Sequence, residues 1–190
     1  MKVAIGGMLE PRENRILSQI GLLVLFASLL TSCAHTSEMI RPSDKIGKMR
    51  VNRYGHSNAQ SIWEFCSDAM TDEPGIQTTE CKVPMVSELF LGLGCVGKDK
   101  LQRDSCWAAR TWELTIDGYP IDLNAFNIAD FDEEREGTQY HHRVWRIRLR
   151  DLTEGNHSLH YVIQVNQQVD DGTPLQPGTY ELLVNFTVEK

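Results

Sequence analysis

The sequence lacks the short motifs by which several common enzyme classes are recognised. It contains no G-x-S-x-G nucleophile elbow, no H-E-x-x-H zinc motif and no G-x-x-x-x-G-K-[ST] phosphate loop. It also lacks an excess of positive charge, because 26 acidic residues outnumber 19 basic ones and the net charge is −7. An acidic surface is repelled by nucleic acid. We therefore expect a protein that is not an enzyme and does not bind nucleic acid.

One uncharged apolar run lies near the start of the chain, and no later run is long enough to span a membrane. It covers residues 16–30, and the residues before it contain Lys2, Arg12 and Arg15 against two glutamates. A helix of that length reaches about 22 Å, which is shorter than the ~30 Å hydrocarbon core of a bilayer. A weakly positive start and a short apolar run are typical of an export signal, which begins at Met1 or at Met8.

The apolar run ends in Leu30-Thr31-Ser32-Cys33. This resembles the lipobox of bacterial lipoproteins, in which an aliphatic residue and two small residues precede a cysteine. The resemblance implies that residues 1–32 are a lipoprotein signal peptide and that Cys33 becomes the lipidated amino terminus, with acyl chains such as palmitate. Two or more chains hold a protein stably on a membrane. The alternative is a buried or disulfide-bonded cysteine that follows an ordinary signal.

A lipid on Cys33 would make the membrane the first partner of this chain. We expect the protein on the extracytoplasmic side of the cell membrane or the outer membrane of a bacterium. Residues 33–58 are polar and nearly free of hydrophobic periodicity, which predicts a flexible tether. The alternative is that Ile46, Met49, Val51 and Tyr54 pack on the domain, which we place at residues 59–190.

Hydrophobic and polar residues alternate in four segments of the C-terminal half, namely 111–116, 144–150, 159–165 and 180–188. Period-two alternation is typical of strands with one buried and one solvated face. Asp117-Gly118 is a two-residue hairpin signal, and residues 87–96 and 122–127 supply two further strands. About seven short strands without an amphipathic helix predict an all-β, antiparallel β-sandwich.

Two late segments resemble known modules. The runs "LTEGNHSLHYVI" (152–163) and "LQPGTYELLVNFTV" (175–188) are similar to the last strands of immunoglobulin-like and fibronectin-III-like domains. The resemblance covers residues 85–190 and implies an immunoglobulin-like sandwich. The Cys…Trp…Cys spacing of true immunoglobulin domains is absent, so the resemblance extends to the architecture and not to that family.

Four cysteines remain once Cys33 is set aside, and an even number is suited to pairing in an oxidising compartment. They are Cys66, Cys81, Cys95 and Cys106. Of the three connectivities, we favour the sequential one, Cys66–Cys81 and Cys95–Cys106, which closes short loops. A four-cysteine zinc site is the rival interpretation, but no spacing is C-x₂₋₄-C.

Four histidines fall in or near the predicted strands. If residues 144–150 and 157–165 form a hairpin, His160 lies near Ile147, and His141 and His142 lie at the opposite end, beside Val165. The two pairs are then separated by most of a strand, so no three-histidine metal site forms from them. We interpret all four, including His157, as solvated surface residues.

The same hairpin would bring two acidic loops, 127–137 and 168–174, to one end of the sandwich. Carboxylates in flexible loops are ligands that Ca²⁺ prefers, although the spacing is not that of an EF-hand. The sequence therefore raises calcium as the single cofactor hypothesis, and the alternative is a solvated acidic rim. The candidate ligands are Asp130, Asp132, Glu133, Glu134, Asp170 and Asp171, with Glu136 beside them.

The expected membrane anchor and the predicted β-sandwich favour one function over two others. We expect a membrane-anchored binding module that presents loops and faces to a protein or an envelope polymer. The first alternative is a structural accessory subunit of an envelope complex. The second is a hydrolase without a recognised motif.

Overall fold

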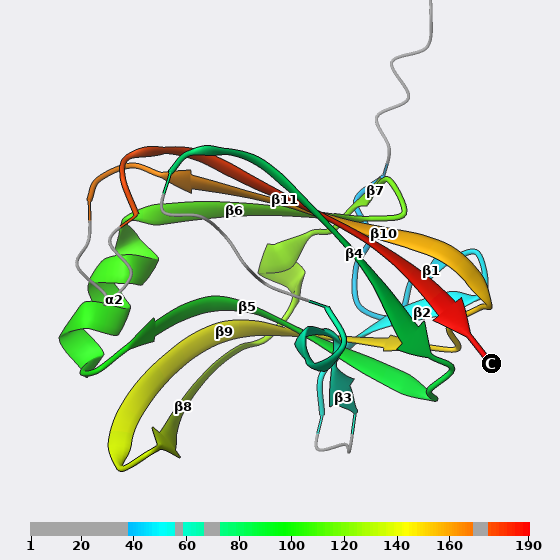
Figure 1. Cartoon of the computed structure of the whole chain (residues 1–190), viewed down its shortest axis with the longest axis horizontal. Coiled ribbons are helices and arrows are strands. Elements are labelled where there is room, and N and C mark those ends of the chain that lie inside the picture. Colours follow the sequence, from blue (N-terminus) through cyan, green and yellow to red (C-terminus); the bar gives the residue numbers. More distant parts are fainter. Residues whose placement is uncertain (1–37, 56–58, 67–72, 169–174) are drawn as a thin grey trace, which may run out of the picture. The chain divides into compact units, whose positions relative to one another are not determined.

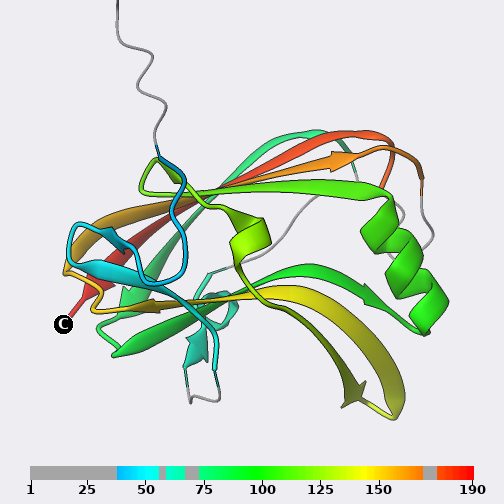
Figure 2. The ribbon, with the colours of Figure 1, turned by 180° about the vertical axis from the view of Figure 1, so that it is seen from behind.

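Two β-sheets lie face to face in the computed structural model, which describes residues 38–55, 59–66, 73–168 and 175–190 (Figures 1 and 2). The first sheet has the strand order β1-β2-β9-β5-β3, with β8 also paired to β9. Its strands are β1 (Lys45–Ile46), β2 (Met49–Arg53), β3 (Gln60–Ser61), β5 (Glu88–Gly97), β8 (Ile128–Arg135) and β9 (Thr138–Arg150).

The second sheet has the order β4-β11-β10-β6-β7. Its strands are β4 (Gly75–Pro84), β6 (Arg110–Ile116), β7 (Tyr119–Pro120), β10 (Gly155–Val165) and β11 (Gly178–Glu189). Three short helices complete the described residues: η1 (Ile62–Glu64), α2 (Lys100–Ala108) and η2 (Leu123–Ala125). In both ribbon views α2 lies at one end of the sandwich, between the ends of the two sheets.

The structure confirms the predicted class, an all-β sandwich, but it differs from the prediction in the number of strands and in their direction. The described residues form eleven strands instead of about seven, because short strands such as β1, β3 and β7 extend the sheet edges. The sheets are also mixed, since β4 runs parallel to β11 and β3 runs parallel to β5. Length and alternation identify strands but not their partners, so neither detail could be read from the sequence.

The predicted inward faces form the core. The alternation in β6, β9, β10 and β11 places the expected hydrophobic residues between the sheets, while Arg146, Arg148 and Arg150 point outward. The two-residue turn at Asp117-Gly118 is confirmed, with φ values of 50° and 78°. The fully buried side chains include Leu114, Ile116, Ile147, Leu149, Leu159, Tyr180, Val184 and Phe186.

The predicted hairpin between residues 144–150 and 157–165 is wrong. These segments are β9 and β10, and they belong to different sheets. Strand β9 pairs with β5 along one edge and with β8 and β2 along the other, so it has no free edge for β10. The chain crosses between the sheets at residues 151–154, where Asp151 has a φ of 56°.

The predicted tether is wrong for residues 38–55, which belong to the sandwich. Strand β2 pairs with β9 from Arg50 to Arg53, and the side chains of Ile46, Met49 and Val51 are buried in the core. The alternative of a docked segment is therefore the one observed. The signal peptide, Cys33 and the rest of the tether up to residue 37 lie outside the described residues, as do residues 56–58.

Helix α2 was not expected, and the segment 122–127 forms the 3-10 helix η2 in place of the predicted strand. A local signal for α2 exists, since Asp99 accepts a hydrogen bond from the Gln102 backbone as its N-cap. The helix has few apolar residues, so periodicity does not reveal it. Among the described residues, no helix is long and apolar enough to span a membrane.

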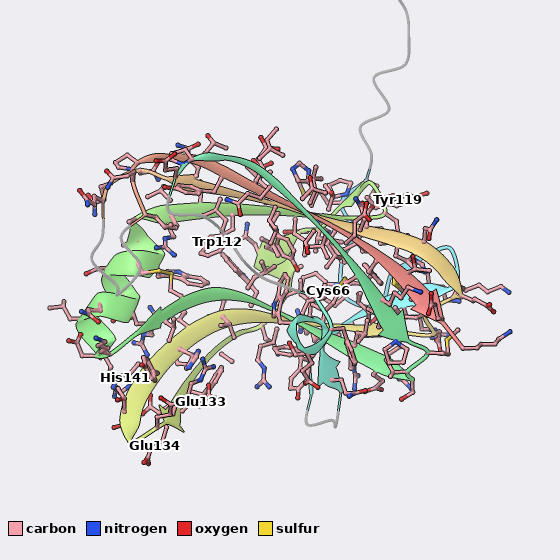
Figure 3. All side chains as sticks on the ribbon, viewed as in Figure 1. Cys66, Trp112, Tyr119, Glu133, Glu134 and His141 are labelled. Carbon is pink, nitrogen blue, oxygen red and sulfur yellow. A yellow bond between two sulfur atoms is a disulfide. The ribbon has the colours of Figure 1, made fainter. Side chains whose placement is uncertain are left out.

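Both sequential disulfides are present. Cys95–Cys106 joins β5 to α2, and Cys66–Cys81 joins a position two residues after the end of η1 to β4. The first bond packs beside Trp107 and Trp112, whose rings cluster with Trp145 between the sheets (Trp112 is labelled in Figure 3). The bonds therefore hold the peripheral segments to the core.

Candidate functional site

The first four residues of the predicted calcium site lie on a strand and not in a loop. Asp130, Asp132, Glu133 and Glu134 belong to β8, which pairs with β9 through the turn at Glu136-Gly137. In an extended strand, neighbouring side chains point to opposite faces, so adjacent carboxylates do not converge on one cation. Figure 3 shows Glu133, Glu134 and His141 at this end of the sandwich.

Three of these carboxylates have basic partners. Arg143 donates from Nε and Nη2 to the two oxygens of Asp130, at 2.9 and 2.7 Å. Asp132 lies 2.6 Å from His141 Nδ1, and Glu133 accepts a hydrogen bond from Arg135 at 2.8 Å. These contacts lower the pKa of Asp130 and of Glu133, in each case mainly through the arginine hydrogen bond.

The Asp130 pair belongs to a network that joins β8 and β9 to α2. Arg143 also contacts Asp104 at 3.0 Å, and the buried Arg103 lies 2.7 Å from the same Asp104 oxygen and 3.5 Å from Asp130. No group of three metal-ligating side chains occurs among the described residues, and Asp170 and Asp171 lie outside them. The geometry therefore gives no support to calcium binding by Asp130, Asp132, Glu133 and Glu134.

Each of the four histidines lies close to a carboxylate. His141 contacts Asp132, His142 lies 3.2 Å from Glu133, His157 contacts Asp117 at 2.8 Å and His160 contacts Glu181 at 2.9 Å. The prediction of solvated surface residues is wrong for His142, which is buried, and for His157, whose side chain is 8% exposed. His160 is opposite Leu183 and Thr115 and not Ile147, because β10 pairs with β11 and β6.

Burial favours the neutral form of His142. Its ring stacks on Phe131 at a centroid distance of 4.6 Å, and desolvation lowers the pKa of His142, against the opposing effect of Glu133. Asp132 also raises this pKa, whereas Arg135 and His141 lower it. An imidazole that resists protonation in the folded state is a source of acid sensitivity.

We expect the stability to fall on acidification more steeply with His142 than without it. Between the unfolded pKa of about 6.5 and the lower pKa of the folded state, the unfolded histidine binds more protons than the folded one, so unfolding is favoured as pH falls through this window. The free energy of unfolding of the wild type, measured in urea between pH 7.5 and 5.5, should decline more than that of His142→Gln. The control His160→Gln should retain the decline, and parallel profiles for wild type and His142→Gln would contradict this assignment.

The outward face of the first sheet carries arginines among aromatic rings. We call it the arginine–aromatic face. Cross-strand register places Phe90 opposite Arg148 and Phe131 opposite His142 on this face. Gly92 is opposite Arg146, and a Cβ there would lie 3.1 Å from the Phe90 ring, so glycine leaves room for that ring. The face consists of Arg50, Arg146, Arg148, Arg150, Tyr54, Phe90 and Phe131.

Arg146 is the centre of this face. Its guanidinium carbon lies 3.9 Å from the centroid of the Tyr54 ring, 5.4 Å from that of Phe90 and 5.8 Å from that of Phe131. Tyr54 and Phe90 also contact each other, at 4.7 Å. Within the described part of the chain, Arg146 forms no ion pair, and its buried Nε has no hydrogen-bond partner. Three rings therefore hold a cation that no described carboxylate neutralises.

The other arginines of the face are only partly neutralised. Glu88 lies 3.0 Å from Arg150 and 3.6 Å from Arg148, so two guanidinium groups share one carboxylate. Arg50 contacts the exposed Asp151 at 3.3 Å. On a protein of net charge −7, this face is a local region of positive charge. The alternation of Arg146, Arg148 and Arg150 is visible in the sequence, whereas their aromatic neighbours come from distant segments.

A glycine-rich run, Gly92–Gly97, has the spacing G-x-G-x-x-G. In nucleotide-binding proteins such a run forms a loop between a strand and a helix, with free amides that bind phosphate. Here the whole run belongs to β5 and pairs with β9 from Arg146 to His141. Gly97 instead allows close approach of α2, because a Cβ at this position would lie 2.6 Å from the backbone nitrogen of Arg103.

Comparisons with known proteins do not assign this chain to a family. No family model matches the chain, and no curated protein matches it. A structure of PbICP-C in complex with falcipain-2 has 14% identity and a TM-score of 0.33, over 64% of this chain and 95% of that chain. The cysteine protease inhibitor EhICP2 from Entamoeba histolytica has 11% identity and a TM-score of 0.27, over 62% and 96%. Likenesses of this size carry no argument about function.

Proposed function

We propose that this protein is a lipid-anchored extracytoplasmic binding module whose arginine–aromatic face binds an acidic segment of a partner protein. The observation that carries the proposal is the Arg146 guanidinium, which contacts three aromatic rings and no described carboxylate. A catalytic reaction forms no part of the proposal.

The chemistry of Arg146 favours a carboxylate partner. A guanidinium is a planar fork that binds a carboxylate through two parallel hydrogen bonds, and ring stacking leaves its edge available. The rings also fix the side chain in advance, which reduces the conformational entropy lost on binding. Arginine, tyrosine and phenylalanine are enriched in protein–protein interfaces, and arginine and tyrosine in their energetic hot spots.

The lipobox-like sequence and the disulfides support the proposal that this face lies outside the cytoplasm. Disulfides persist in oxidising compartments, and two are present in the described domain. The lipobox-like sequence at Cys33 provides the attachment to a membrane, and the residues between Cys33 and the sandwich provide the spacer. In this proposal the lipid supplies membrane binding, so the positive face is available to a protein.

Photo-crosslinking in the native cell tests the proposal. Benzoylphenylalanine at Val144, which points outward between Arg146 and His142, should form a discrete adduct with one protein. The same probe at Val162, on the outward face of the second sheet, should not form it. The cross-linked peptide, sequenced by mass spectrometry, should be rich in aspartate and glutamate.

Arg146→Gln is the decisive variant. Loss of a hot-spot arginine costs about 2 kcal/mol, or roughly thirtyfold in affinity, so the adduct should be nearly abolished. Arg41→Gln removes an exposed arginine outside the face, which is paired with Asp122, and should leave the adduct intact. An adduct that survives Arg146→Gln, or one formed with a polysaccharide and not with a protein, would overturn the proposal.

A further inference from the structure

The described chain enters the sandwich beside the short strand β7. The Ile40 amide donates to the Pro120 carbonyl at 2.8 Å, and Ile40 forms an isolated parallel bridge with Ile121. The Asp122 amide in turn donates to the Ile40 carbonyl at 2.9 Å. In both ribbon views the first described residues lie next to β7 (Figures 1 and 2). The start of the described chain is therefore fixed to one edge of the second sheet.

Two large apolar side chains are exposed where the chain enters. Met39 is 55% exposed and Tyr119 is 48% exposed, whereas the adjacent Ile40 and Ile121 are buried. Figure 3 shows Tyr119 at this edge of the second sheet. Arg41 follows in the chain, and its side chain is largely exposed. We call Met39, Arg41 and Tyr119 the entry surface.

Two carboxylates beside the entry surface are already paired. Asp122 lies 3.1 Å from Arg41 Nε, and Asp117 contacts His157 at 2.8 Å and accepts a hydrogen bond from the Ser158 amide at 2.8 Å. Arg41 uses Nε for this contact, and a guanidinium has further donors that can reach a headgroup phosphate. Tyrosine is enriched at membrane interfaces, because its ring is apolar and its hydroxyl is polar. The chemistry of the entry surface therefore fits a lipid surface.

The number of residues between Cys33 and the sandwich limits how far the entry surface can lie from the membrane. Glu38 is the first described residue, and it comes five positions after Cys33. Five residues span at most about 18 Å when the chain is fully extended. In the proposed lipid anchor Cys33 lies at the headgroups. The covalent chain therefore keeps the entry surface within a short reach of them.

We infer that the entry surface docks on the membrane that anchors the protein, with Met39 and Tyr119 inserted in the headgroup region. This inference rests on the proposed lipid anchor. The anchor supplies a high effective concentration of membrane, so a small surface suffices for docking although it is too weak to bind an unanchored protein to vesicles. The entry surface shares no residue with the arginine–aromatic face, so docking leaves that face available to a partner protein.

Fluorine NMR of the full mature lipoprotein in phosphatidylcholine nanodiscs tests the docking. A fraction of the lipid carries a nitroxide near its headgroup, which broadens the resonance of any fluorine close to the bilayer. Trifluoromethylphenylalanine replaces Tyr119 in one sample. In the other it replaces Phe131, an exposed aromatic residue on the outward face of the first sheet. We expect strong broadening at position 119 and little at position 131.

Met39→Ser, with the probe kept at position 119, tests whether the surface itself contributes. The equilibrium constant for docking should fall about fivefold, which corresponds to about 1 kcal/mol for burying roughly half of a methionine side chain. Met39→Leu keeps an apolar side chain and should retain the original broadening. Val96→Ser is the matched control, because Val96 is also exposed but belongs to β5 in the first sheet, and it should retain the broadening as well.

Three results would overturn the docking while leaving the anchor in place. The first is an unbroadened resonance at position 119 in a sample whose Cys33 carries the lipid. The second is equal broadening at positions 119 and 131, which would mean that the domain takes all orientations at the end of its tether. The third is unchanged broadening in Met39→Ser, which would mean that tether length alone brings the surface near the bilayer. Absence of a lipid on Cys33, measured by mass spectrometry of the same sample, would overturn the anchor and the docking together.

Discussion

Replacing Cys95 and Cys106 together by alanine should lower the free energy of unfolding by about 3 kcal/mol. The bond closes a loop with a sequence separation of 11, and the chain-entropy estimate for such a loop is about 3 kcal/mol. Both cysteines are buried beside Trp107 and Trp112, so the substitution also leaves a small void. For a domain of this size, the melting temperature should fall by roughly 6–12 °C.

Urea unfolding measures the loss in the free energy of unfolding. Near-UV circular dichroism of the same variants reports whether the tryptophan environment changes. The control is the double variant of Cys66 and Cys81, whose separation of 15 predicts a similar loss of about 3 kcal/mol. The Cys95/Cys106 variant should alter the signal of the cluster formed by Trp107, Trp112 and Trp145, because that bond packs beside it. If reductant leaves the wild-type melting temperature unchanged, neither bond contributes in the way assigned here.

Replacing Cys33 by serine should release the protein from the membrane or block its processing. A serine hydroxyl does not form the thioether that anchors the lipid, and without acyl chains the acidic domain has no attraction for anionic lipids. The wild type should sediment with membranes and incorporate labelled palmitate. Cys33→Ser should do neither.

Ser32→Ala is the control for this experiment, because it keeps a small residue immediately before Cys33. It should be processed, labelled and sedimented like the wild type. Equal palmitate labelling of the wild type and Cys33→Ser would contradict the lipidation hypothesis. Membrane association of Cys33→Ser without label would point instead to the apolar run at residues 16–30 as an uncleaved anchor.

Several features of this protein follow from the sequence because their causes are local. Alternation over segments such as 144–150 and 180–188 predicts which side chains enter the core, since the side-chain period of a strand is two. Asp117-Gly118 predicts its turn, because both positions require a positive φ. The sequential disulfides also follow, because cysteines close in the chain pair at low entropic cost. The lipobox-like sequence around Cys33 remains a prediction.

Only the tertiary structure decided which strands pair, and the candidate sites depend on that choice. Alternation in β9 and β10 is compatible with a hairpin, but β9 is already paired along both edges, so β10 lies in the other sheet. The same pairing places Asp130 beside Arg143 in a strand, where the sequence predicted an acidic loop. Long-range pairing also brings Tyr54, Phe90 and Phe131 around Arg146. Periodicity determines which way a side chain faces, whereas its neighbours are determined by how the sheets pair and pack across the whole chain.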